Sequence, residues 1–92
     1  MTEEQLMLLE YADLIASVEY VKKQINIKYG QLDMCPSELL EYHSYLKNKL
    51  KGFKLNYISE EHDEMMSKIV GSPTFDVITK VKTIINLNPC EV

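Results

Sequence analysis

Apolar residues recur along this chain with the spacing of α-helices. In its first third they alternate steps of four and three, at Met7, Tyr11, Leu14, Val18, Val21 and Ile25. This spacing places all six on one side of a helix, and its period is close to the value of about 3.5 that keeps two helices in contact. We therefore predict one long helix, whose six-residue apolar seam either packs in the core of the subunit or serves self-association as a homodimer.

The ends of this first helix carry capping signals, so we expect it to run from about Glu3 to Tyr29. Thr2 and Gln5 have the spacing of a capping box, and Gly30 suits the left-handed residue that closes many helices. A weaker second stripe predicts a second set of neighbours for the same helix; its members are Leu9, Ala16, Tyr20 and Ile27.

A second helix is predicted after a short connection, with Pro36 in its first turn and its end near Tyr57. Its stripe comprises Leu39, Tyr42, Leu46, Leu50, Phe53 and Tyr57. Residues 53–58 also alternate apolar and polar side chains, as a half-buried strand would. We prefer the helix because the stripe continues through Phe53 to Tyr57 without a break in phase.

Two shorter helices are expected in the last third, over residues 60–70 and 74–87. Ser59 is the predicted cap of the first, and Ser72 with Pro73 is the predicted start of the second. The apolar half of the last helix comprises Phe75, Val77, Ile78, Val81, Ile84 and Ile85. The predicted fold is all-α, a single domain over 1–92, in which a long antiparallel hairpin carries two shorter helices.

The composition argues against some classes of function but does not identify one. The 92 residues carry a net charge of −4, and all ten basic residues are lysines. Because arginine is the usual reader of guanine, its absence argues against sequence-specific DNA binding. No apolar run approaches the roughly 20 residues of a membrane span, and the acidic start is unlike a signal peptide. We expect a soluble cytoplasmic protein, and the Lys, Ile and Asn content suits a low-GC bacterium or its phage.

The densest polar cluster lies at the start of the third helix. Glu60, Glu61 and Glu64 spell E-E-x-x-E, and Glu38 with Glu41 spells E-x-x-E. These two stretches resemble motifs of the all-α nucleotide pyrophosphohydrolases of the MazG type, in the reverse order. The resemblance implies a magnesium-dependent hydrolase as one alternative. We prefer the simpler interpretation, in which acids in a first turn stabilise the helix and lie in water.

A second alternative is a helix-turn-helix DNA-binding regulator formed by helices 60–70 and 74–87. Gly71 would lie in the turn, and Lys80 and Lys82 would face DNA. Two lysines provide little positive charge to bind the DNA phosphates, so we rank this alternative below protein binding.

Little else in the sequence indicates chemistry. His43 and His62 stand without a recognisable nucleophile, and Cys35 and Cys90 are expected to be separate thiols. We therefore predict no enzyme, no cofactor and no metal site. The expected function is a small acidic regulator or inhibitor that binds another protein sterically. The residues predicted to meet a basic partner surface are Glu60, Glu61, Asp63 and Glu64.

Overall fold

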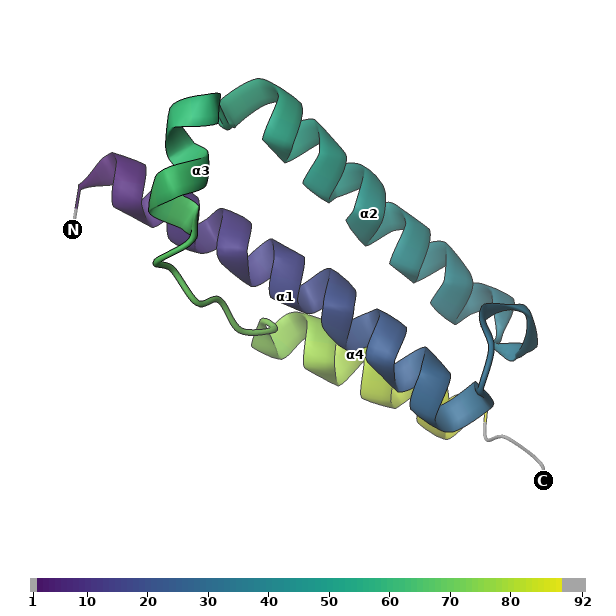
Figure 1. The fold of residues 1–92 in the computed structure, drawn as a ribbon. Coiled ribbons are helices and arrows are strands. Elements are labelled where there is room, and N and C mark those ends of the chain that lie inside the picture. Colours follow the sequence, from purple (N-terminus) through teal and green to yellow (C-terminus); the bar gives the residue numbers. More distant parts are fainter. Residues whose placement is uncertain (1, 89–92) are drawn as a thin grey trace.

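The computed structural model of the chain describes residues 2–88 and places a long helical hairpin at its centre (Figure 1). The elements are α1 (Glu3–Tyr29), a 3-10 turn η1 (Leu32–Met34), α2 (Ser37–Tyr57), α3 (Glu60–Met66) and α4 (Phe75–Leu87). α1 and α2 run antiparallel, α3 caps one end of the pair, and α4 lies along α1 toward the other end. This arrangement confirms the predicted all-α fold.

The ends of α1 follow the capping chemistry that the sequence predicts. The Thr2 hydroxyl accepts from the Gln5 backbone N–H, and the Gln5 side chain accepts from the Thr2 N–H. At the other end Gly30 adopts a φ of 80°, and its N–H donates to the Asn26 carbonyl. The helix makes the molecule elongated, with principal extents of 47 × 21 × 17 Å.

The main core lies where α1, α2 and α4 meet. α1 contributes Val21 and Ile25, while α2 contributes Leu39 and Leu46. The buried residues of α4 are Val77, Val81 and Ile84. The Tyr29 hydroxyl donates to the Asn88 carbonyl at 2.7 Å, which fastens the end of α4 to the end of α1.

Toward the N-terminus, aromatic packing holds the hairpin together. The Tyr11 ring of α1 stacks on the Phe53 ring of α2, with their centroids 5.6 Å apart. Phe53 also contacts Tyr57, at 5.1 Å between centroids. These contacts support the helical interpretation of residues 53–57 over the strand alternative.

The segment between α3 and α4 crosses α1 in close contact with its backbone. A Cβ atom at Gly71 would overlap the carbonyl group of Ala12 and the backbone nitrogen of Asp13. The Ser72 N–H donates to the Asp13 carboxylate at 3.0 Å, and the Thr74 N–H donates to the Ser17 hydroxyl at 3.3 Å. Only glycine allows so close an approach, so Gly71 sets where the chain crosses.

This crossing corrects two predicted helix boundaries. α3 ends at Met66 instead of residue 70, because the following residues leave the helix to reach α1. α4 begins at Phe75 with Thr74 as its cap, not at a Ser72–Pro73 pair, because the hydrogen bond of Ser72 to α1 belongs to the crossing. Pro36 likewise precedes α2 as its cap residue instead of lying in the first turn.

One predicted core residue of α4 is also exposed. Phe75 retains 80% of its accessible surface, although it was expected on the apolar half of the helix. Residues two apart on a helix point to nearly opposite sides, so Phe75 faces away from the buried Val77.

The close crossing generates a stability prediction with a matched control. Gly71→Ala should lower the free energy of unfolding by about 1–3 kcal/mol, since the new methyl group meets fixed backbone. Gly52→Ala should raise it by about 0.5–1 kcal/mol, because Gly52 lies inside α2 with open space around its Cα. Urea unfolding of both variants measures the difference. Equal changes in the free energy of unfolding of the two variants would contradict the close approach of Gly71 to the α1 backbone.

Candidate functional site

α3 is tied to the first turn of α1 through one histidine. The His62 Nδ1 accepts a hydrogen bond from the Ser59 N–H at 2.9 Å, which completes a capping box at the start of α3. The His62 Nε2 lies 2.9 Å from a carboxylate oxygen of Glu4. Because Nδ1 accepts, Nε2 carries the ring proton and donates it to Glu4. The sequence analysis missed this link, although a histidine three residues after Ser59 takes the usual place of Glu or Gln.

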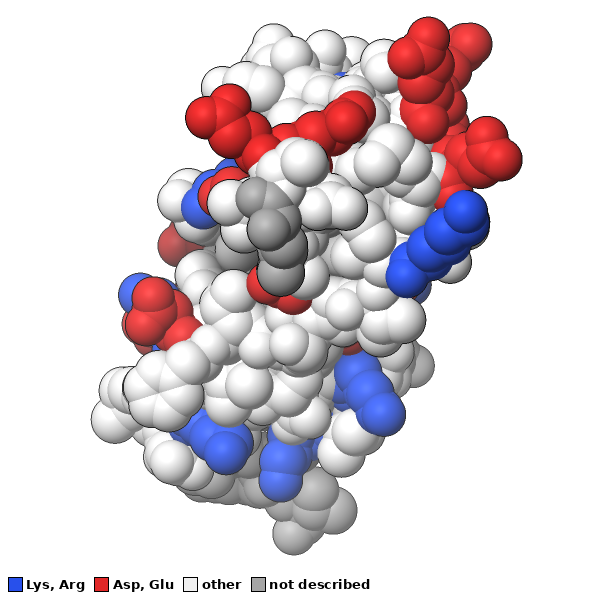
Figure 2. Space-filling model, turned by 90° about the vertical axis from the view of Figure 1, so that its left-hand side faces the viewer, with Lys and Arg blue, Asp and Glu red and all other residues white. Residues whose placement is uncertain are grey.

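This arrangement leaves the acids of α3 in water. Glu60, Glu61, Asp63 and Glu64 are all exposed, and within residues 2–88 none of them forms an ion pair. Figure 2, which faces this end of the bundle, shows acidic side chains gathered over its upper part and lysines farther down. The four predicted partner-binding residues are exposed acids of this one short helix, and we call them together the α3 acidic surface.

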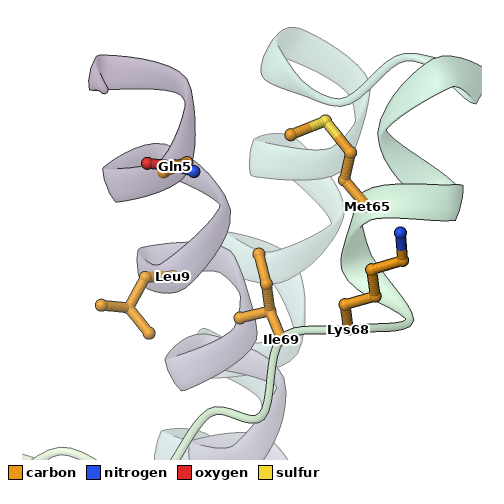
Figure 3. Close-up of a pocket in the computed structure, with 5 residues that line it drawn as sticks. All are labelled: Gln5, Leu9, Met65, Lys68 and Ile69. Carbon is orange, nitrogen blue, oxygen red and sulfur yellow. The ribbon is translucent and has the colours of Figure 1, made fainter. Parts of the chain in front are cut away.

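An apolar groove lies beside this surface, between α1 and the end of α3 (Figure 3). Its volume is about 510 Å³, and its lining residues are Gln5, Leu9, Met65, Lys68 and Ile69. A second groove of about 470 Å³ shares Ile69 and continues along α1 past Ala12 and Ala16. Leu9 and Ala16 belong to the second stripe predicted from the sequence, and their neighbours include the chain's own residues 65–71.

The structure does not bring the two acidic motifs together. Glu38 lies in the first turn of α2, whereas Glu60 follows the far end of the same helix. A helix of this length spans about 30 Å, so the two motifs cannot share one metal ion. Within residues 2–88, no group of three or more His, Cys, Asp or Glu side chains is arranged to hold a metal.

The predicted helix-turn-helix geometry is wrong. α3 and α4 are separated by the crossing segment 67–74, and α3 packs on α1. A helix-turn-helix unit needs its two helices joined by a short turn and packed on each other. Lys80, one of the predicted DNA-facing residues, lies over the Tyr42 ring at 5.6 Å from its centroid.

The apolar seam of α1 contributes to the subunit's own core. Tyr11, Val21 and Ile25 are buried, while Met7, Leu14 and Val18 remain half-buried. Leu14 and Val18 pack against the main core. Self-association through the seam stays a prediction, and the part of the seam that retains exposed surface is Met7, Leu14 and Val18.

Cys35 offers little reactive chemistry. Burial raises the pKa of the Cys35 thiol, and the nearby Asp33 carboxylate adds to the shift. Cys90 lies outside the described residues, so the expectation of two separate thiols stays a prediction.

Comparison with known proteins yields no match: no protein family, curated protein or solved structure is significantly similar to this chain. Within residues 2–88, each helix is too short or too polar to cross a membrane.

His43 is the one buried histidine of the described chain. Only 6% of it is exposed, and its Nε2 has no hydrogen-bond partner within residues 2–88. Burial lowers its pKa below the ordinary 6.5, and the ammonium groups of Lys47 and Lys22 lower it further. Glu19 also lines the adjacent pocket and is the acidic group facing the same region. His43 is therefore neutral at pH 7.

The depressed pKa of His43 predicts how stability depends on pH. Below about pH 6.5 the unfolded chain binds a proton that the folded chain resists, so this contribution is present above that pH and is lost as the pH falls. His43→Leu should flatten the change in urea midpoint between about pH 7.5 and 5.5. Gly52→Ala, which changes no titratable group, is the control and should retain it. If the urea midpoint of His43→Leu changes with pH as steeply as that of the wild-type chain, His43 is not the source of this pH dependence.

Proposed function

We propose that this chain is a small acidic regulator or inhibitor that binds another protein sterically and catalyses no reaction. The observation that carries the proposal is the α3 acidic surface beside an open apolar groove. Four exposed carboxylates without ion pairs in the described chain attract a basic partner, while the groove offers apolar area to anchor it.

The partner that fits this surface is a basic protein segment with one apolar side chain between its positive charges. The apolar side chain would enter the groove between Leu9, Met65 and Ile69. Lysines or arginines around it would face the carboxylates of α3. The hydrogen bonds of His62 hold α3 against α1, so the surface is formed before the partner arrives. Such a rigid surface acts by covering the partner's own functional face, in the cytoplasm of the host.

Charge reversal at α3 tests this proposal. Glu60→Lys combined with Glu64→Lys should abolish capture of the partner from host extract, because it replaces attraction with repulsion. The matched control is Glu38→Lys with Glu41→Lys, which changes the net charge equally at the far end of α2. Quantitative mass spectrometry of the captured proteins measures both. The proposal fails if the wild-type chain captures no protein that the α3 variant loses and the control retains.

We also propose that the regulator acts as a homodimer, through the exposed parts of Met7 and Leu14 in the predicted seam of α1. A short chain with a modest core gains buried area by pairing. Light scattering at tens of micromolar should then give about twice the 10.7 kDa mass of one chain. Met7→Lys should shift the mass toward the monomer, while Ile27→Lys, an exposed residue outside the seam, should not. A monomeric wild-type chain would contradict the proposal.

A further inference from the structure

A third pocket lies between α1 and α2, and its chemistry differs from that of the α3 end. Its volume is about 320 Å³, and none of its lining residues comes from α3 or α4. α1 contributes Ile15, Val18, Glu19 and Lys22, and α2 contributes His43, Lys47 and Leu50. The pocket therefore depends only on the hairpin and is preformed by it.

The lining combines an apolar part with a positive part. Ile15, Val18 and Leu50 offer hydrocarbon surface. Lys22 and Lys47 bring one ammonium group from each helix, against the single carboxylate of Glu19. With His43 neutral, the lining has an excess of one positive charge. An occupant with a negative head and an apolar body would be attracted by both parts.

His43 is part of the pocket lining. Its unpaired Nε2 has almost no accessible surface, so an occupant of the pocket would act on this ring through its charge and not by bonding to that atom. The two lysines that line the pocket also disfavour the charged form of this ring. An anion held between these lysines would reverse that influence.

We infer that this pocket binds a small organic anion with an apolar body, of the class of medium-chain monocarboxylates. The carboxylate would lie between Lys22 and Lys47, near the ring of His43. The chain of the ligand would lie on Ile15, Val18 and Leu50. Inorganic phosphate would leave the apolar surface uncovered, and a metal cation would be repelled by the two ammonium groups. The site is separate from the α3 acidic surface and does not rest on the proposed partner.

Titration of the intact chain with octanoate tests the inference by NMR. Saturable shifts are expected for the methyl groups of Ile15, Val18 and Leu50. Bound octanoate should also raise the pKa of His43, read from its ring proton signals, because the carboxylate offsets the lysines. Inorganic phosphate should bind more weakly, and octylammonium should not bind at this pocket.

Matched lysine variants locate the carboxylate. Lys22→Gln and Lys47→Gln should each weaken octanoate binding about two- to fivefold, as expected for loss of a partly exposed ion pair. Lys23→Gln and Lys51→Gln remove the same charge from the same two helices outside the pocket lining, and should leave affinity unchanged. All four residues are exposed, so the variants should retain the fold.

Several results would overturn the inference. They are the absence of saturable octanoate binding, shifts confined to the groove between α1 and α3, equal binding of octylammonium, or equal effects in all four lysine variants. The α3 charge-reversal variant should bind octanoate as the wild-type chain does. Loss of partner capture in that variant with octanoate binding intact would therefore separate the two sites.

Discussion

The close approach of Gly71 to the α1 backbone is the constraint on which the arrangement of the other helices depends. At this point the chain passes over Ala12, and the hydrogen bonds of Ser72 to Asp13 and of Thr74 to Ser17 hold it there. The Ser17 hydroxyl also donates to the Asp13 carbonyl at 2.8 Å, so both anchors belong to one turn of α1. The crossing therefore defines where α3 must end and where α4 must begin.

This division of α1 gives the molecule two regions of different character. Before the crossing, α3 lies against the first turns of α1, and the surface is acidic and grooved. Beyond it, α4 closes the main core with Val77, Val81 and Ile84. The hairpin pocket, on a part of α1 and α2 that α4 does not line, is positive. A chain of net charge −4 thus carries one pocket whose lining has an excess of positive charge.

The sequence was sufficient for the elements that local chemistry determines. Both ends of α1 follow from Thr2, Gln5 and Gly30, and the stripe through Phe53 correctly extended α2 to Tyr57. The α3 cap at Ser59 was also predicted, because its side-chain oxygen acts within the next three residues. The acids in the first turn of α3 are exposed, as expected of charges that stabilise a helix start.

Tertiary contacts decided what the sequence left open. From the sequence alone, a glycine at position 71 suits either a turn or a close crossing of two backbones. Only its contact with Ala12 shows that it makes a crossing. The seam of α1 has a period that suits pairing with a second chain, yet Val21 and Ile25 are covered by the subunit's own helices. The surroundings of His62 and His43 likewise depend on tertiary contacts and could not be predicted from the sequence. His62 accepts from the Ser59 N–H through Nδ1 and contacts Glu4 through Nε2, whereas His43 is buried near Lys22 and Lys47.

These two histidines differ because of what surrounds each ring. His62 finds a backbone donor on one side and a carboxylate on the other, so its hydrogen bonds are satisfied and it acts as a link between helices. His43 is buried, has the ammonium groups of Lys47 and Lys22 nearby, and has no partner for its Nε2 within residues 2–88, so its neutral form is favoured. The two proposed sites therefore differ in charge: α3 exposes carboxylates, whereas the lining of the hairpin pocket has an excess of one positive charge.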